Sequence, residues 1–151
     1  MQITSKFTAA VHILTCIKVF GGEMRVTSDF LSGSTGVNAV IVRNVLGQLR
    51  TAGIVETCQG SGGAHLAKPA AEITLYDVYR AVECISSKND DGDSGLFRFH
   101  ENPNVKCPVG RNIHRVMDGR LEAAQAALEN ELKSTTLAEI VADTKKIIEE
   151  E

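Results

Sequence analysis

The sequence lacks tryptophan, and its 151 residues include only three prolines and four cysteines. It contains no run of about 18 apolar residues, which excludes an ordinary transmembrane helix. The N-terminus has no basic stretch followed by an apolar stretch and a cleavage site, so we expect no secretory signal. These absences predict a cytoplasmic protein without a membrane partner.

The four cysteines are scattered along the chain without a C-x-x-C pair, at Cys16, Cys58, Cys84 and Cys107. Disulfide frameworks and zinc sites use cysteines at characteristic short spacings. We therefore expect reduced thiols and no metal site. Cys16 falls among apolar residues at helical spacing, which favours a buried role.

Acidic residues are also scarce in the first half of the chain. Residues 1–70 carry six basic and three acidic side chains, whereas residues 71–151 carry ten basic and sixteen acidic ones. The small positive excess is compatible with a polyanionic partner but is weak evidence alone. With 43% hydrophobic residues, the chain can bury one ordinary core.

Glycines concentrate in "CQGSGGAH", residues 58–65. A phosphate-binding Walker loop needs a lysine after its last glycine, and a dinucleotide loop needs G-x-G-x-x-G before a helix; neither pattern is present. The glycines instead permit a sharp reversal between two extended runs, Gly53 to Thr57 and Ala64 to Ala67. The segment therefore predicts a hairpin.

Three helices precede this hairpin. Apolar residues at helical spacing predict the first over residues 3–20. The second fits Thr27 to Ser32 with Gly33 as its terminator, and the third runs from a cap at Asn38 to about Ala52. Three helices followed directly by a glycine-tipped hairpin is the order of a winged helix-turn-helix in a mainly α protein.

Residues 100° apart divide the third helix into two faces. The expected core face is Ile41, Val42, Val45, Leu49 and Ala52. The opposite face is Ala39, Val40, Arg43, Asn44, Gly47 and Arg50. Small residues there permit close approach, an arginine can reach a guanine edge or a phosphate, and a valine can touch a thymine methyl. A plain solvated surface helix is the alternative.

The predicted DNA-binding set adds the cap residues of the second and third helices and the polar residues of the hairpin, which can donate to phosphates. It comprises Thr27, Ser28, Asn38, Ala39, Val40, Arg43, Asn44, Gly47, Arg50, Gln59, Ser61, Gly62, Gly63 and His65. We expect His65 to be a structural or phosphate contact rather than a metal ligand.

Three segments, "SKFTAAVHIL", "VTSDFL…GVNAVIVRNVLGQLRTAGIV" and "GSGGAHLAKPAAEITLYDVYRAVE", resemble the Rrf2 family of winged helix-turn-helix transcription regulators. The similarity runs from about Ser5 to Glu83. The later "FRFHENPNVKCPVG" resembles the YwnA-type branch, which lacks a complete iron-sulfur cysteine motif. The resemblance implies a homodimer that binds an inverted-repeat operator in double-stranded DNA. Many of the family respond to iron-sulfur status, nitric oxide or thiol oxidants.

The second half of the chain is predicted to be helical around one polar loop. Thr74 and Asp77 make a capping box for a fourth helix, and "SSKNDDGDSG" reads as a mobile loop without the spacing of a calcium-binding EF-hand. We expect a DNA-binding domain over 1–85, an acidic loop and connector over 86–106, and a dimerisation helix and terminal helix over 107–151.

A long helix is expected from Pro108 onwards, because an apolar stripe continues for about seven turns. It exceeds what so small a core can cover, which indicates a dimer seam. The predicted dimer interface is Ile113, Val116, Leu121, Ala124, Leu128 and Leu132. Thr136 and Glu139 form a capping box for a last helix that packs against the domain or the partner.

Cys107 is the one residue that matches the cluster cysteines of the family, which group three cysteines before the dimer helix. Because iron-sulfur clusters need about four ligands, we expect no cluster and no cofactor. At a helix N-terminus beside Lys106 and Arg111, the Cys107 thiolate would be favoured, which suits a redox sensor. A plain helix cap is the alternative.

Together these features predict a non-enzymatic, homodimeric DNA-binding transcription regulator, a repressor that responds to redox or electrophile stress. Two other classes stay open at this point. One is an iron-sulfur or metal-binding redox protein, and the other is a helical interaction module without DNA binding.

Overall fold

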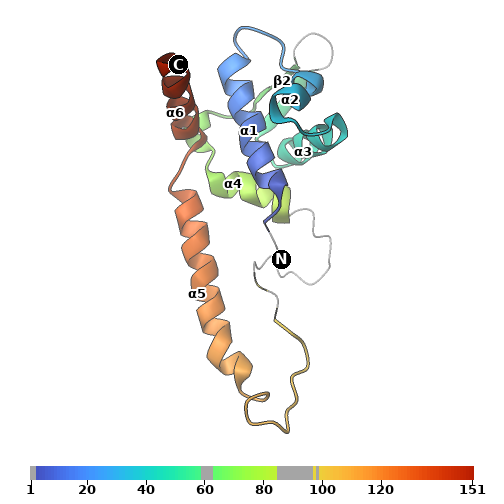
Figure 1. Cartoon of the computed structure of the whole chain (residues 1–151), viewed down its shortest axis with the longest axis vertical. Helices are drawn as coiled ribbons and strands as arrows, with labels where there is room; N and C mark the ends of the chain where they lie inside the picture. Colours follow the sequence, from blue (N-terminus) through green and yellow to red (C-terminus); the bar gives the residue numbers. More distant parts are fainter. Residues whose placement is uncertain (1–2, 59–62, 85–96, 98) are drawn as a thin grey trace.

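The computed structural model describes residues 3–58, 63–84, 97 and 99–151, and the elements follow one another as Figure 1 shows. In chain order they are α1 (Ser5–Phe20), α2 (Ser28–Thr35), α3 (Ala39–Thr51), β1 (Val55–Cys58), β2 (Gly63–Leu66), a 3₁₀ turn η1 (Ala70–Glu72), α4 (Leu75–Tyr79), a π-helical turn η2 (Arg80–Cys84), α5 (Ile113–Lys133) and α6 (Leu137–Glu150). The fold is mainly α with one two-stranded antiparallel sheet, as predicted.

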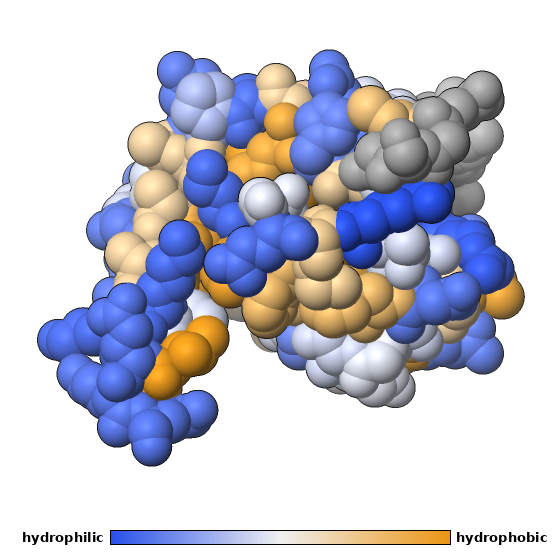
Figure 2. Space-filling model, turned by 90° about the horizontal axis from the view of Figure 1, so that it is seen from above, coloured by the Kyte–Doolittle hydropathy of each residue, from blue (hydrophilic) through white to orange (hydrophobic). Residues whose placement is uncertain are grey.

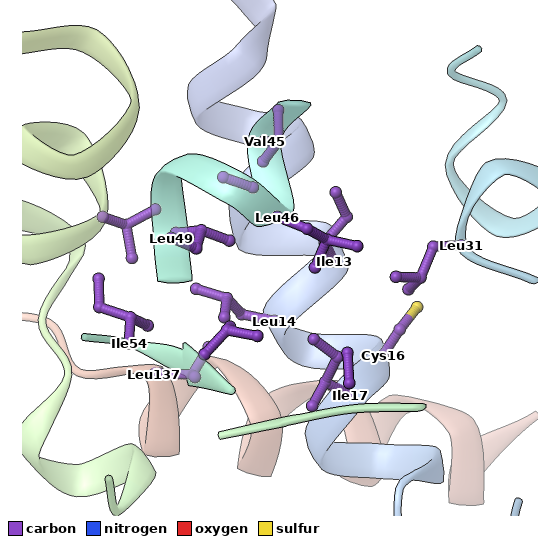
Figure 3. Close-up of a cluster of buried hydrophobic side chains, with 14 of the residues drawn as sticks. Ile13, Leu14, Cys16, Ile17, Leu31, Val45, Leu46, Leu49, Ile54 and Leu137 are labelled. Carbon is purple, nitrogen blue, oxygen red and sulfur yellow. The ribbon is translucent and has the colours of Figure 1, made fainter. Parts of the chain in front are cut away.

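Helix α1 is the centre of the core. Its first turn is capped by Thr4, whose hydroxyl accepts a hydrogen bond from the backbone N–H of Lys6 at 3.3 Å. The middle of its predicted apolar face is buried and meets side chains from α2, α3 and α6 (Figure 3), whereas Ile3, which the spacing placed on that face, precedes the helix and is 39% exposed. The buried residues of α1 are Ala10, Ile13, Leu14, Thr15, Cys16 and Ile17.

Helix α2 is longer than the sequence predicted, and the proposed terminator Gly33 is wrong. The helix continues through Gly33 to Thr35 and ends at Gly36, which has a φ of 69°. This left-handed conformation is the one that a helix C-terminus favours in glycine. The Ser32 hydroxyl then donates to the carbonyl of Val37 at 2.6 Å, which fixes the turn into α3.

Helix α3 has the predicted bounds and the predicted cap, since the side-chain oxygen of Asn38 accepts from the backbone N–H of Val40 at 2.8 Å. Its buried stripe is Val42, Val45, Leu46 and Leu49. Two residues assigned to the core face are instead exposed, Ile41 at 42% and Ala52. The stripe follows i, i+3, i+4 and i+7 spacing from Val42, so Leu46 replaces Ile41 as a core residue.

Strands β1 and β2 form the predicted hairpin, hereafter the wing. The pairs are Val55 with Leu66, Glu56 with His65, Thr57 with Ala64, and Cys58 with Gly63. Val55 and Ala64 are buried, so one side of the wing packs on the core. The predicted tip contacts Gln59, Ser61 and Gly62 lie outside the described residues.

Both predicted capping boxes are present. Thr74 and Asp77 exchange hydrogen bonds at the start of α4, and Thr136 and Glu139 do so at the start of α6. Residues 74 and 136 also pair as an isolated β-bridge, and the backbone N–H of Leu137 donates to the carbonyl of Ile73 at 2.7 Å. The junction between α5 and α6 is therefore fastened to the start of α4.

Helix α5 begins at Ile113, and the predicted start at Pro108 is wrong. Residues 105–112 form successive turns, in which Gly110 packs so tightly that an added Cβ would overlap the carbonyl of Asn104. Glycine and asparagine are weak helix formers, and the side chain of Asn112 donates to the carbonyl of Pro108 at 2.8 Å. The regular helix consequently starts after Asn112.

Helix α5 lies outside the packed body that the other helices form. Helix α6 packs on α1 and contributes Leu137 and Val141 to the core, whereas α5 projects away from the body (Figure 1). No residue of α5 is buried. On the face seen in Figure 2, polar residues dominate and apolar ones form separate smaller areas. Within the described ranges, no helix is long and apolar enough to cross a membrane.

Candidate nucleic-acid interface

A groove of about 410 Å³ lies where α2, α3 and the wing meet. Its lining combines the start of α2, the outer side of α3 and the inner side of the wing. The lining residues are Arg25, Val26, Thr27, Ser28, Arg43, Leu46, Gly47, Arg50, Thr57, Gly63 and Ala64. Six of the fourteen predicted DNA-binding residues therefore line the groove: Thr27, Ser28, Arg43, Gly47, Arg50 and Gly63.

Three arginines, Arg25, Arg43 and Arg50, line this groove. The guanidinium of Arg50 donates to the hydroxyl of Thr57 at 3.2 Å, which ties the end of α3 to the wing. Arg43 lies 4.0 Å from the carboxylate of Asp29, and the two side chains are 58% and 88% exposed. An ion pair this exposed contributes little to stability. Arg43 therefore remains available to an anionic partner.

The outer face of α3 has the predicted composition. Val40 is 59% exposed, and Arg43 and Asn44 are exposed beside it. Ala39 and Gly47 are half-buried and small, and a Cβ added to Gly47 would meet nothing within 4 Å. A helix with this face can lie close to the floor of a major groove.

Two predicted contacts have a structural role in this interface. The hydroxyl of Thr27 accepts from the backbone N–H of Phe30 at 3.2 Å and caps α2, just as Asn38 caps α3. The polar oxygens of both residues are therefore occupied by helix ends. Ser28, the first residue of α2, lines the groove, where the positive end of the helix favours a phosphate.

Gly63 positions the wing. It has a φ of 65°, and an added Cβ would lie 2.8 Å from the carbonyl oxygen of Val26. The neighbouring Ala64 donates its N–H to that same oxygen at 3.0 Å. Only glycine allows this close approach, so Gly63 attaches the wing to the segment before α2.

His65 does not line the groove. It pairs across the strands with Glu56, and alternation along a strand places both on the face of the wing opposite Thr57 and Ala64. Its Nε2 atom lies 3.2 Å from a carboxylate oxygen of Glu56. The imidazole is thus engaged within the wing.

The sequence prediction missed Arg25 and Thr57. Arg25 stands two residues before the cap of α2, and Thr57 alternates with Glu56 and Cys58 on β1. Its position so close to the start of a helix could have indicated Arg25 as part of the interface. The inward orientation of Thr57 follows only from the strand register, which a sequence with a glycine-rich turn leaves open.

Cys107 lies in the turns before α5 and not at the helix N-terminus, which corrects the predicted setting. The pKa of its thiol is lowered by hydrogen bonding to the backbone N–H groups of Gly110 and then Val109, against a small opposing effect of desolvation. The side chain is exposed. The thiolate is therefore favoured, as expected, but the cause is a local turn and not a helix dipole.

The predicted seam residues of α5 lie on its partly covered and exposed surface. Val116 is 50% exposed and Ala124 is exposed. Ile113, Leu121, Leu128 and Leu132 are half-buried. At its C-terminal end the helix contacts α4, where the ammonium of Lys133 lies 4.5 Å from the centre of the Tyr76 ring.

A three-helix core, an outward basic third helix and an attached wing define a winged helix-turn-helix DNA-binding protein. The model of the Rrf2 family, described as an iron-dependent transcriptional regulator, matches residues 3–143. The chain belongs to this family. It is accordingly a DNA-binding transcriptional regulator and not an enzyme.

Individual relatives agree with this assignment. The chain is 38% identical over 140 residues to YwnA of Bacillus subtilis (strain 168), a candidate HTH-type transcriptional regulator, with 93% of this chain and 97% of YwnA covered. A crystal structure of a candidate DNA-binding protein is 33% identical with a TM-score of 0.68, covering 90% of this chain and 98% of that one. IscR of T. potens shares the fold at 21% identity and a TM-score of 0.69, covering 97% and 90%.

The family description names iron as the metal on which the regulators depend. Cys107 is the only cysteine after residue 84, and iron-sulfur clusters take about four ligands, mostly thiolates. His114 is engaged with Asp118 at 3.2 Å, and among the residues with described positions no three His, Cys, Asp or Glu side chains are grouped to hold a metal ion. The described donor set does not fit a cluster.

Proposed function

We propose that this regulator acts as a homodimeric repressor, in which two recognition helices and two wings bind an inverted-repeat operator and oxidation of Cys107 weakens binding. The observation that carries the proposal is the groove with Arg25, Arg43 and Arg50 between α3 and the wing. Neutralising phosphates with several arginines supplies sequence-independent affinity, and α3 supplies the reading of bases.

Two features of the interface support base reading by α3. Arg43 is exposed on the outer face and can donate two hydrogen bonds to a guanine, while Val40 can contact a thymine methyl. The absence of a side chain at Gly47 leaves room for the duplex. Arg50 and the wing then hold the backbone on the flank of the major groove.

The dimer is supported by α5. Helix α5 has 21 residues and no buried side chain, yet it carries an apolar stripe. Exposing that stripe to water costs free energy unless a second apolar surface covers it. A second copy presents the same stripe, and two-fold pairing makes the contact self-complementary. We assign the DNA-binding part to residues 1–85, the connector to 86–106 and the dimerisation part to 107–151.

The two-fold dimer determines the operator and the direction of control. Half-sites should be about one helical turn apart, roughly 10 base pairs. A dimer on two adjacent major-groove segments excludes other proteins from that stretch, so occupancy of a promoter represses.

A DNA partner also places the protein in the compartment that holds the chromosome, the cytoplasm of a bacterium.

Cys107 is the proposed redox input. Its favoured thiolate is exposed, and it lies in the turns that lead into α5. Oxidation to a sulfenate or a mixed disulfide adds bulk or charge at the base of the helix that sets the spacing of the two wings. A tenfold loss of affinity needs only about 1.4 kcal/mol of differential stabilisation between two dimer arrangements.

The test uses a Cys58→Ser background, which leaves Cys107 as the exposed thiol among the cysteines with described side chains. Binding to the operator is titrated before and after treatment with diamide, and again with Cys107→Ser added. We expect oxidation to weaken binding only when Cys107 is present. Equal sensitivity with and without Cys107 would exclude it as the sensor, and absence of salt-sensitive DNA binding in the reduced protein would favour an interaction module.

A further inference from the structure

Three side chains with complementary chemistry meet on the outer face of the wing. The thiol of Cys58 lies 3.9 Å from Nδ1 of His65, within hydrogen-bonding range for sulfur. The Nε2 atom of the same imidazole lies 3.2 Å from a carboxylate oxygen of Glu56. A thiol, an imidazole and a carboxylate thus form one chain of contacts.

The strand register produces this arrangement. Glu56 and His65 are direct cross-strand partners, and Cys58 follows Glu56 by two residues on β1. Because side chains alternate between the faces of a strand, all three project from the same face. The other face carries Thr57 and Ala64, which line the groove. The three residues therefore lie outside the interface assigned to the arginines.

The contacts favour one tautomer of the neutral imidazole. An ionised carboxylate only accepts hydrogen bonds, so Nε2 of His65 must be protonated to donate to Glu56. In a neutral imidazole the other nitrogen, Nδ1, is then an acceptor. In that tautomer the Cys58 thiol donates to Nδ1, which is the geometry of a nucleophile beside its base with a third group orienting the base.

We propose that Cys58 is a reactive thiol and a reversible modification site of the wing, which forms a mixed disulfide with small-molecule disulfides such as oxidised glutathione. His65 accepts the thiol proton, and Glu56 holds the imidazole and stabilises its protonated form. This site is separate from Cys107 and from the arginine-lined groove.

The reaction is a thiol–disulfide exchange and needs no further oxidant. The Cys58 proton moves to Nδ1 of His65 as the sulfur attacks one sulfur of the disulfide. A new S–S bond forms, the original S–S bond breaks, and the departing thiolate takes the proton back from the imidazole. One small thiol is released for each protein thiol that is oxidised.

The other cysteines with described side chains have no such neighbours. Cys16 is 5% exposed, and its sulfur lies 3.3 Å from the hydroxyl of Ser34. Cys107 is exposed, but the hydrogen bonds that favour its thiolate come from backbone N–H groups, which cannot accept a proton. Within this set, Cys58 alone combines exposure with a base.

The consequence for DNA binding rests on the proposed function, in which the wing lies on the duplex backbone. Cys58 is the last residue of β1 and pairs with Gly63 at the end of the hairpin nearest its tip. A glutathione adduct there adds a bulky, negatively charged group beside the phosphates. Modification should therefore weaken binding, and reduction should restore it.

The first experiment measures the reaction itself, in full-length protein carrying Cys107→Ser. The rate of mixed-disulfide formation with oxidised glutathione is followed at Cys58 by mass spectrometry of its peptide. We expect His65→Gln to slow the reaction by at least about tenfold, and Glu56→Gln to slow it by a smaller factor. His12→Gln is the matched control, because His12 bonds to Ser34 on another surface, and its rate should equal that of the parent.

Urea unfolding of each variant establishes that the wing domain is still folded. A Cys58 rate that is unchanged by His65→Gln in folded protein would overturn the proposal. So would a rate at Cys58 no greater than that at the buried Cys16 of the same molecules.

The second experiment compares operator binding by the Cys58 mixed disulfide and by the reduced protein. Both proteins carry Cys107→Ser, so that only Cys58 can respond. We expect at least tenfold weaker binding, recovered with dithiothreitol, and no effect of the same treatment when Cys58→Ser is added. Unchanged affinity of the fully modified protein would refute the effect on DNA binding. Failure of the reduced protein to bind any DNA would instead count against the proposed function, and the reaction rates would still decide whether Cys58 is reactive.

Discussion

At the residue scale, Arg43 is the side chain expected to read sequence. It is exposed on the outer face of α3 and has only a long, solvated contact with Asp29. Arg43→Ala should cost about 1 to 3 kcal/mol of binding free energy and relax the preference for one base pair, since a bidentate contact to guanine is lost. Fluorescence anisotropy with operator variants measures both effects.

Arg115→Ala on α5 is the matched control, because it removes the same charge from an exposed site far along the chain from the groove. It should leave binding almost unchanged. If Arg43→Ala instead weakens binding to every sequence equally, the arginine contacts phosphate and not a base.

Cys107 gives a prediction about pH. Its pKa is lowered in the folded protein, and a thiol reacts as its thiolate, which is populated above the pKa. The alkylation rate of Cys107 in native protein should therefore persist to lower pH than the rate of the same residue in urea-unfolded protein. Iodoacetamide labelling across a pH series, read at the Cys107 peptide, makes the comparison. Coincident profiles would show that the local turn does not favour the thiolate.

The sequence could predict those residues whose environment depends on one element. Asn38 as a cap, Arg43 as an outward residue and the two capping boxes follow from helix geometry alone. Arg25 and the contact of Cys58 with His65 could not be predicted, because they depend on where the wing docks and on its register. The sequence of a single helix or strand does not show where that element packs against the rest of the chain.

At the element scale, α3 carries a glycine in its interior that costs helix stability and leaves space at the interface. Gly47→Ala should raise the free energy of unfolding by up to about 1 kcal/mol, because alanine is the better helix former and its Cβ meets no protein atom within 4 Å. The same methyl group projects into the groove and should weaken DNA binding. Urea unfolding and anisotropy titration measure the two effects.

Gly119→Ala in α5 is the control for this substitution, because an added Cβ there also meets nothing within 4 Å. It should stabilise the fold without altering affinity. A Gly47→Ala variant that binds DNA as tightly as the parent would show that α3 does not approach the duplex closely at this point.

Element boundaries were the least predictable part of the fold. The sequence analysis placed the end of α2 at Gly33, whereas the chain's path into α3 places it at Gly36, which has a positive φ. Pro108 is a good first-turn residue, but the packing of Gly110 against Asn104 delays the start of α5. Each error arose where tertiary contacts decided between two acceptable local signals.

At the scale of the whole molecule, the exposed stripe of α5 predicts that oligomer state and DNA affinity change together. Leu121→Glu places a charge in the proposed seam, far from the contact between Lys133 and Tyr76 that attaches α5 to the body. We expect dissociation to monomers and loss of tight operator binding, since a monomer contacts one half-site only. Sedimentation velocity and anisotropy titration measure the two properties.

Ala126→Glu adds the same charge about 140° around the helix from position 121, on an exposed surface away from the stripe. It should remain dimeric and bind DNA normally. A Leu121→Glu protein that is still a dimer would place the seam elsewhere on the molecule.

Two copies of the arginine-lined groove are expected to bind one symmetric site, and a hydroxyl-radical footprint on the DNA upstream of the protein's own gene tests this directly. We expect two protected backbone segments related by two-fold symmetry, with centres about 10 base pairs apart, and protection that fades as salt is raised. A single protected segment without symmetry, or no protection at low salt, would contradict it.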